Sequence, residues 1–328
     1  MKTDLDPLIE MIREAVHAHA VPEESGGYVR FTGRGRMTSD EYGCADAANI
    51  RYTIGDFERV PELRAAAVTR LQAFQDPETG LFSEETHHPL HATAHCLAAL
   101  ELFDAGALYP PVTLIEYLEP EVLKTFLSKL DWSGTPWSQS HQGAGLFAAL
   151  ALTGNAATAW RNVYFDWLDE HCDPEYGMSL KGAIQTGGAD PARHLFGWFH
   201  YLFNYLYARR PFPHAPRLID TCLRLYREHR MPEAFGRVPN FMEIDWIFAL
   251  NRACRQTSWR FDEVHEVLRD FAIAYIPAME TYCKTSGFED LHGLFGAVTA
   301  LAELQLALPG ELESSIPLKN VLDRRPFI

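Results

Sequence analysis

The sequence contains few of the features by which function is usually recognised. Its six cysteines stand singly, without a C-x-x-C pair, and Lys and Arg number only 29 against 44 Asp and Glu, a formal net charge of -15. A surface of this sign does not attract nucleic acid or an anionic membrane. We therefore expect neither as a partner. The sequence also has no cluster of Lys or Arg that would make part of the surface positive despite the negative net charge.

Long apolar runs are also missing. No stretch approaches the roughly 18 apolar residues of a membrane-spanning helix. The N-terminal MKTDLDPLIEMIREAV is acidic and amphipathic, and it lacks the apolar core of a signal peptide. Single cysteines in a chain without such a signal are most simply buried thiols in a reducing compartment. These absences predict a cytoplasmic protein.

Three common catalytic and nucleotide-binding motifs are absent. There is no Gly-x-Ser-x-Gly elbow, no Walker loop, and no dinucleotide fingerprint in a strand–helix setting. The glycine-rich stretch SGGYVRFTGRGRM carries Arg30, Arg34 and Arg36, but no strand–helix unit frames it. We interpret it as a rim loop that contacts an anionic group, such as a carboxylate or phosphate. No cofactor is expected.

What the sequence does contain is a repeated turn. The segment DPETG at 76–80 returns as DPEYG at 173–177. Looser copies lie at Gly35, Gly134, Gly236 and Gly287. Copies that follow one another at intervals of a few tens of residues indicate that one supersecondary unit is repeated several times along the chain.

Each turn separates two helical stretches of different character. The first is amphipathic, as a surface helix is, and the second is apolar nearly all round, as a buried helix is. No convincing alternating strand run appears. We predict amphipathic helices at about 61–74, 120–130, 157–172, 216–230 and 261–283. The apolar helices are predicted at about 45–54, 90–103, 141–152, 193–207, 243–254 and 291–306.

Six such pairs resemble the α/α-toroid, a closed ring of helical hairpins. This architecture is shared by six-hairpin glycosidases, several polysaccharide lyases, sugar epimerases, and the terpenoid cyclase and protein prenyltransferase superfamily. The resemblance covers about residues 5–306. It implies an all-α fold, a single (α/α)6 barrel domain over 1–328. The last residues, 314–328, read as an extended C-terminal tail whose role is left open, with the covering of a neighbouring surface as one option. An open helical solenoid is the alternative.

In a closed ring the starts of the six apolar helices meet at one end, and there we predict the site. Four helices carry His near this position, and the other two carry Asp46 and Asp245. We predict catalytic roles for Asp46, His141, Asp245 and His292. Substrate contacts are predicted for Tyr42, Asn49, His91, His95, Trp137, Ser140, His194, Glu243, Trp246 and Asp290.

The histidines are stronger evidence for a functional site than the acidic residues are. Helix N-termini favour anions, so Asp46, Asp245 and Asp290 are equally explained as N-caps. Histidine gains nothing there, because the helix terminus disfavours its charged form and lowers its pKa. Four helices with His at one end therefore indicate a shared pocket of neutral imidazoles.

Aromatic residues beside the same positions favour a sugar. Trp137, Trp198 and Trp246 lie next to the predicted site, and an aromatic face can stack on a sugar ring whose hydroxyls bond nearby polar groups. We favour a pocket role for Trp137 and Trp246. Trp160 and Trp167, on an amphipathic helix, are expected in the core.

The ionisable residues predict an acid/base enzyme acting on a carbohydrate or uronate, with a small molecule or oligosaccharide as substrate, and we favour a glycoside hydrolase-like reaction over elimination or epimerisation. Asp46 and Asp245 as a carboxylate pair would give hydrolysis, the reaction of a glycoside hydrolase. His141 or His292 taking a proton beside a carboxylate would give elimination or epimerisation, the reactions of a sugar lyase or epimerase.

Three other hypotheses remain open. A terpenoid-type cyclase, dehydratase or isomerase would use an aromatic-lined cavity, although the DxDD, DDxxD and zinc-ligand patterns of that superfamily have no match. Metal ligands need bonds of about 2 Å, and we expect helices around a wide barrel to lie too far apart to share an ion. The one exception is a set formed by His91, His95 and either His87 or His141. Because the other histidines are expected to lie too far apart, we predict no bound metal. A non-catalytic binding or scaffold protein is the last alternative, and the oligomeric state is left open.

Overall fold

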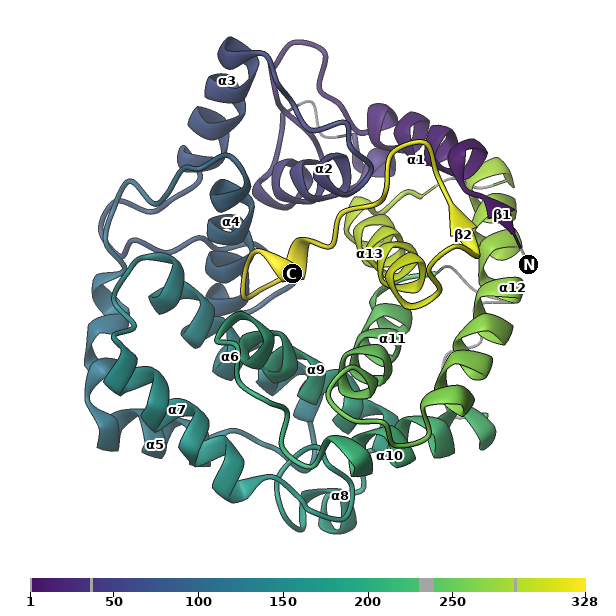
Figure 1. The fold of residues 1–328 in the computed structure, drawn as a ribbon. Helices are drawn as coiled ribbons and strands as arrows, with labels where there is room; N and C mark the ends of the chain where they lie inside the picture. The colour runs from purple at the N-terminus through teal and green to yellow at the C-terminus, as the bar shows by residue number, and fades with distance from the viewer. Residues whose placement is uncertain (1, 36–37, 230–238, 286–287) are drawn as a thin grey trace. The chain divides into compact units, whose positions relative to one another are not determined.

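The computed structural model describes residues 2–35, 38–229, 239–285 and 288–328. Arg36 and the turn glycines Gly236 and Gly287 lie outside these residues. Within them the protein is mainly α-helical (Figure 1), as predicted. The exceptions are two short strands, β1 (Thr3–Asp4) and β2 (Leu312–Glu313), which pair in parallel.

The helices alternate in character along the chain. The amphipathic ones are α1 (Asp6–Ala18), α3 (Pro61–Gln72), α5 (Pro120–Lys129), α7 (Thr158–His171), α10 (Ala215–Arg227) and α12 (Phe261–Thr285). The apolar ones are α2 (Glu41–Thr53), α4 (Pro89–Leu102), α6 (Pro136–Leu152), α9 (Pro191–Tyr207), α11 (Phe241–Cys254) and α13 (Leu291–Ala307). Shorter helices are α8 (Ala183–Thr186), η1 (Thr32–Arg34), η2 (Val112–Leu118) and η3 (Val321–Asp323).

Burial confirms this alternation. Helix α5 buries only Leu123 and Leu127, whereas α4 and α13 are buried along almost their whole length. Trp160 and Trp167 of α7 are buried, as predicted for core residues. The apolar pattern, read at helical spacing, therefore identified the helices that form the core.

Two apolar helices begin earlier than predicted. Helix α2 begins at Glu41 because Asp40 caps it, accepting a hydrogen bond of 2.7 Å from the Gly43 backbone N–H. Helix α6 begins at Pro136, since proline fits the first position of a helix. Asp46 and His141 consequently lie about one turn inside their helices rather than at the ends.

The residue contacts group the chain into two compact units. Unit 1 comprises the described residues of 1–74, 232–251 and 260–321, and unit 2 those of 75–231, 252–259 and 322–328. Within unit 1, the first and last apolar helices, α2 and α13, pack against each other. Within unit 2, α6 packs against both α4 and α9.

Glycine allows the close helix packing in unit 2. A Cβ atom at Gly145 of α6 would lie 2.8 Å from the Leu90 carbonyl oxygen of α4. At Gly197 of α9 it would lie 2.7 Å from the Pro136 carbonyl oxygen of α6. Neither contact is compatible with a side chain, so these two glycines set the distance between the N-terminal halves of the three helices.

The repeated turn has the same structure in both good copies. Asp76 accepts hydrogen bonds at Oδ1 from the Glu78 and Thr79 backbone N–H groups, and Asp173 accepts one from Glu175. The last residue, Gly80 or Gly177, has a positive φ of 73° or 70°. The shared sequence therefore encodes an Asp-stabilised turn that ends in a left-handed glycine.

Replacing Gly177 with Ala is expected to destabilise the protein by more than the φ penalty alone. A positive φ costs a non-glycine residue about 1–2 kcal/mol, and the new Cβ would collide with the Leu218 backbone nitrogen, adding about 1–3 kcal/mol. Gly154→Ala is the matched control, because Gly154 has a φ of 75° but no atom within 4 Å of its added Cβ. Chemical unfolding of both variants measures the difference, and equal losses would contradict the steric account.

The C-terminal residues of unit 2 lie against its helices. Phe327 and Ile328 are buried, and the Asn204 side chain of α9 donates a hydrogen bond of 2.9 Å to the Pro326 carbonyl. Arg324 pairs with Glu101 of α4 at 2.9 Å. Residues 322–328 therefore pack on the helices of unit 2, whereas the role of the whole tail at 314–328 stays a prediction.

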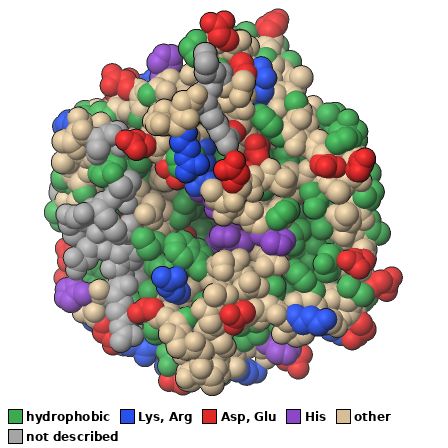
Figure 2. Space-filling view, turned by 180° about the vertical axis from the view of Figure 1, so that it is seen from behind, with side chains coloured by type: hydrophobic (Ala, Val, Ile, Leu, Met, Phe, Trp, Pro, Cys, Tyr) green, Lys and Arg blue, Asp and Glu red, His purple; other side chains and the backbone are tan. Residues whose placement is uncertain are grey.

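Charged side chains are spread over the surface. Asp and Glu are scattered over the face shown in Figure 2, and the Lys and Arg on that face lie in separate places. No helix among the described residues is both long enough and apolar enough to cross a membrane.

Candidate functional site

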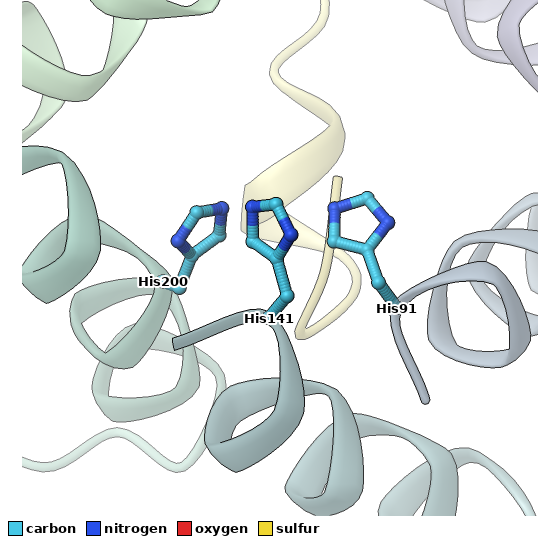
Figure 3. Close-up of side chains that lie close together, drawn as sticks. All are labelled: His91, His141 and His200. Carbon is cyan, nitrogen blue, oxygen red and sulfur yellow. The ribbon is translucent and has the colours of Figure 1, made fainter. Parts of the chain in front are cut away.

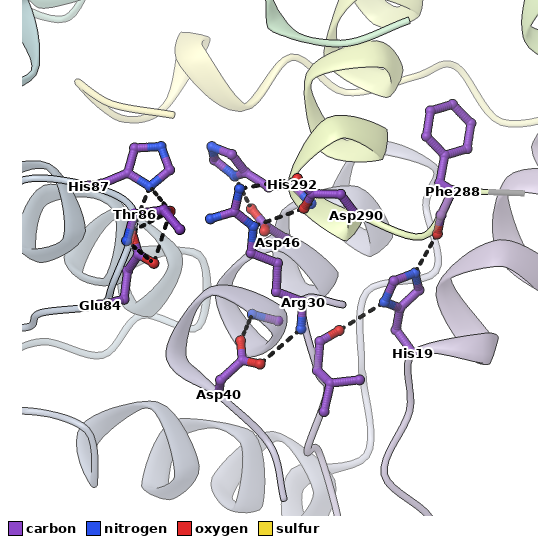
Figure 4. A network of polar contacts seen from close by, with 12 residues as sticks. His19, Arg30, Asp40, Asp46, Glu84, Thr86, His87, Phe288, Asp290 and His292 are labelled. Carbon is purple, nitrogen blue, oxygen red and sulfur yellow. Dashed lines mark hydrogen bonds and ion pairs between the residues drawn. The ribbon is translucent and has the colours of Figure 1, made fainter. Parts of the chain in front are cut away.

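Asp46 and His292 form a buried hydrogen-bonded pair in unit 1 (Figure 4). Nδ1 of His292 lies 2.9 Å from Oδ1 of Asp46, which is fully buried, while His292 is 7% exposed. The pair joins the two neighbouring helices α2 and α13. Because the carboxylate accepts the Nδ1 proton, Nε2 of the imidazole keeps its lone pair and can act as a base.

Aromatic rings surround this imidazole. The ring of Tyr42 meets that of His292 edge-on at a centroid distance of 5.0 Å, and Phe241 lies 4.4 Å away. Apolar walls of this kind exclude water and strengthen the attraction between the imidazole and the carboxylate. Predicted residues Tyr42, Asp46 and His292 are thus brought together.

Arg30 completes the polar network on the same side of unit 1. Its Nε and Nη2 donate to Oδ1 and Oδ2 of Asp290 at 2.8 and 3.1 Å, and its guanidinium lies 5.3 Å from the Tyr42 ring centroid. The predicted rim arginine therefore has an anionic partner within the protein. Arg34 is exposed above the Phe31 ring at 3.7 Å, and it forms no ion pair with another described residue.

The three acids differ in their relation to the helix ends. Asp290 is an N-cap, as its Oδ1 accepts a hydrogen bond of 3.0 Å from the His292 backbone N–H. Asp46 is not, because Asp40 caps α2. Asp245 lies in the second turn of α11, which is capped by Asn240, whose Oδ1 accepts a hydrogen bond of 3.1 Å from the Met242 N–H. Glu243 completes this cap, because its Oε2 accepts a hydrogen bond of 2.9 Å from the Asn240 N–H. The substrate contact predicted for Glu243 stays a prediction.

Asp245 is an unusual carboxyl group. It is fully buried, and neither of its oxygens has a hydrogen-bond partner among the residues that the structure describes. Burial, together with the charge of Glu243, raises its pKa well above the ordinary value. A carboxyl that stays protonated can donate a proton, which agrees with the predicted catalytic role.

Two other predicted contacts in unit 1 have structural roles. Trp246 is fully buried and packs against Phe271 of α12 at a centroid distance of 5.1 Å, which is a core environment. Asn49 is also fully buried, and its Nδ2 donates to the Ala45 carbonyl one turn earlier at 2.9 Å. The pocket role of Trp246 stays a prediction, since a large apolar ring next to a polar residue is as common in a core as in a site.

A second cluster, in unit 2, contains three histidines from three helices (Figure 3). His91 of α4, His141 of α6 and His200 of α9 each offer a ligand atom, and these atoms lie within 4.8 Å of one another. His95 lies one turn along from His91, with ring centroids 6.3 Å apart. His91 and His141 belong to the set that was excepted from the expected wide separation of the histidines, and the structure adds His200 from a third helix.

His200 was missed by the sequence analysis. Only the first turns of the apolar helices were considered, and His200 lies in the third turn of α9. Its signal was present in "RHLFGWFHYLF", where a second His follows the first on the same helix. Ser140, a predicted contact, lies next to it, with Oγ 2.8 Å from His200 Nδ1.

His87 extends this cluster towards the surface. It stacks on His91 with centroids 4.5 Å apart, and its Nδ1 lies 2.6 Å from Oε1 of Glu84 (Figure 4). Burial alone would raise the pKa of Glu84, but the hydrogen bonds from His87 and Thr86 outweigh it and hold the pKa at about 2. The carboxylate therefore stays ionised and fixes the orientation of His87.

His194, also a predicted contact, lies apart from the cluster. Its Nδ1 is 2.9 Å from the Ser179 hydroxyl, and it has no ring contact with the other histidines of the described chain. Burial lowers its pKa to about 4, although Asp190 and Asp131 act in the opposite direction. The predicted neutral imidazole is thus present, but its cause is desolvation rather than the helix terminus. Trp137 is half-buried against Phe196, at 5.0 Å.

The lowered pKa of His194 predicts a pH dependence of stability. An unfolded His binds a proton below about pH 6.5, whereas the folded one does so only near pH 4. Acidification between these values therefore favours unfolding, by up to about 1.4 kcal/mol per pH unit. Urea unfolding of His194→Gln should show a smaller loss of stability over this range than the wild type, and an unchanged slope would contradict it.

A pocket elsewhere in unit 1 contains none of the predicted residues. It is lined by Arg13, Val16, His17, Tyr28, Arg51, Ile54 and Asp56. Arg13 is paired with Asp56, and Arg51 donates to the Asp56 carbonyl at 3.0 Å. Because these charged groups satisfy one another, the pocket is a weaker candidate than either histidine site.

The predicted site residues thus form two sets. Tyr42, Asp46, Asp290 and His292 gather in unit 1, and His91, His95, Ser140 and His141 gather in unit 2. That both sets line one pocket stays a prediction. No family model matches the sequence, and no curated protein or solved structure matches it either.

Proposed function

We propose that the six helical hairpins close into an α/α-toroid. Two kinds of contact support this: α4, α6 and α9 pack in chain order within unit 2, and α13 packs against α2 within unit 1. Contact between the first and last apolar helices is what ring closure requires and what an open solenoid lacks. Small-angle scattering tests the proposal, because a compact chain of this length has a radius of gyration of about 20 Å, and an open array would exceed it.

We further propose that the protein is an acid/base enzyme acting on a carbohydrate or uronate, with His292 as the group that transfers the proton. The buried Asp46–His292 hydrogen bond of 2.9 Å carries this proposal. The carboxylate holds the imidazole in one tautomer and stabilises the imidazolium that forms when Nε2 takes a proton. Asp46 would thus be a positioning residue.

This role for Asp46 favours proton abstraction over hydrolysis. A hydrolytic carboxylate pair needs both acids facing the scissile bond, but Asp46 is engaged by His292. Abstraction of the proton next to a uronate carboxylate leads to elimination or epimerisation, depending on whether a leaving group departs or a proton returns on the other face. Asp245, with its raised pKa, would be a suitable proton donor for the second step.

The surroundings of His292 favour an anionic sugar over a neutral one. Arg30 and Arg34 both lie over the Phe31 ring, at 4.7 and 3.7 Å, and Arg30 in turn contacts Tyr42 beside His292. Arg34 is exposed, so it is available to a substrate carboxylate. An arginine near the abstracted proton would also stabilise the negative charge that develops on that carboxylate.

A panel of substrates tests the proposal. Oligouronides and neutral 4-nitrophenyl glycosides are incubated with the wild-type protein, and the products are separated by mass and by ultraviolet absorbance. We expect an unsaturated or epimerised uronide. Release of 4-nitrophenol, with no reaction on any uronide, would favour hydrolysis and contradict the proposed role of His292.

A further inference from the structure

The histidine cluster of unit 2 has the geometry of a metal site. The rings of His91, His141 and His200 are inclined to one another, with interplanar angles of 53°, 86° and 78°, so they do not form a stack. Figure 3 shows the three rings in a row, with His141 in the middle and nitrogens of neighbouring rings facing one another. His91 and His200 are buried, and His141 is half-buried.

The distances allow one ion to be shared. Nitrogen ligands about 2.0–2.1 Å from a tetrahedral zinc ion lie about 3.4 Å apart. The ligand atoms of the cluster lie within 4.8 Å of one another. Small rotations of the imidazole rings close this difference without any movement of the helices, whose separation is fixed by Gly145 and Gly197.

The tautomer of His200 is suited to binding a metal. The single hydroxyl proton of Ser140 is donated to the Trp137 carbonyl at 2.5 Å. The contact of 2.8 Å between Ser140 Oγ and His200 Nδ1 must then be a hydrogen bond donated by the ring. This leaves Nε2 unprotonated, with its lone pair available, and a hydrogen bond to the opposite ring nitrogen is the usual outer-shell support of a metal-bound His.

Phe327 shields the cluster. Its ring is fully buried and lies 4.9 Å from His91 and 6.4 Å from His200. His87, which is paired with Glu84, stacks on His91. The apolar cover limits the access of solvent to a bound cation, and the nearby carboxylate supplies negative charge.

We propose that His91, His141 and His200 bind one divalent transition-metal ion. Three neutral imidazoles suit Zn²⁺, Co²⁺, Ni²⁺ or Cu²⁺, whereas Mg²⁺ and Ca²⁺ require oxygen ligands. Three protein ligands leave a fourth position for water or another small ligand. All three proposed ligands belong to unit 2, and none of them is a member of the acid/base pair proposed in unit 1.

Metal titration tests the proposal directly. The full-length protein is treated with a chelator and titrated with Zn²⁺ against a chromophoric competitor, and with Co²⁺ by visible spectroscopy. We expect one ion per chain and the intense absorption of tetrahedral Co²⁺. His141→Gln should weaken Zn²⁺ binding more than 100-fold, whereas His171→Gln, in the same unit but outside the cluster, should bind as the wild type does.

The Ser140→Ala variant distinguishes a metal site from a cluster of histidines that only pack against one another. The variant keeps all three imidazoles but removes the acceptor that sets the His200 tautomer, and we expect Zn²⁺ affinity to fall about 10–100-fold. Circular dichroism of the metal-free variants controls for folding. Failure of the wild-type protein to bind stoichiometric Zn²⁺ would overturn the proposal, and so would equal affinity in the wild type and the folded His141→Gln variant.

Discussion

Replacing His292 with Gln is expected to lower turnover by about 10²–10⁴-fold, the usual contribution of a general acid or base. Gln approximates the shape of the imidazole and can still donate a hydrogen bond to Asp46, but it cannot take a proton at the position of Nε2. Its 7% exposure and its contacts with Tyr42 and Phe241 show that the site is enclosed, so water is a poor replacement base.

Asp46→Asn is the companion change. The amide retains the size of the carboxylate but does not stabilise the imidazolium, so a loss of similar order is expected with little change in KM. His265→Gln, at a half-buried position of α12 beside Phe261, is the control and should retain full activity. A His292→Gln variant that melts like the wild type and keeps its activity would show that the pair only supports the fold.

Asp290→Ala is expected to cause a large loss of stability. Asp290 caps α13 and also receives the two hydrogen bonds of the buried Arg30 guanidinium. Loss of a cap costs about 1 kcal/mol, and loss of charge-assisted hydrogen bonds about 1.5–3 kcal/mol. The Asp290 side chain is 38% exposed, so solvent screens the ion pair and its contribution lies at the lower end of that range. We therefore expect a total loss of about 2–4 kcal/mol.

Asp290→Asn separates the two contributions. Asn is as good an N-cap as Asp, but it carries no charge for Arg30. The free energy of unfolding of the Asn variant should therefore fall between those of the wild type and the Ala variant. If both variants unfold like the wild type, the segment around Arg30 is held by its backbone alone, through the hydrogen bonds from Leu291 N–H to the Arg30 carbonyl and from Thr32 N–H to the Glu289 carbonyl.

The helices of this protein were predictable from the sequence because apolar residues at helical spacing gave their extent. Prolines at the first positions of α3 and α5 also gave the starts of these two helices. The starts of α2 and α6 were placed too late, since the capping Asp40 and the first-turn Pro136 each precede a stretch of mixed polarity. Cap residues outside the apolar pattern are the weakest part of such predictions.

The site was only partly predictable, for a different reason. His91, His141 and His292 stood out because imidazoles are rare in apolar helices, and the structure places each in a cluster. His200 was missed, and the position of Trp246 against Phe271 was not foreseen, because the direction of a side chain depends on its rotation about the helix axis. That rotation is set by tertiary packing. The sequence pattern alone locates a side chain along its helix only to within about one turn.

Proton exchange at the substrate carbon tests the central claim most directly. An oligouronide is incubated with the protein in D₂O, and the signal of the proton next to the carboxylate is followed by NMR. Abstraction by His292 predicts that this signal is lost with the wild type, through elimination or through epimerisation with deuterium, and is retained with His292→Gln. Cleavage of the sugar with the signal retained, or equal loss in both proteins, would contradict the account.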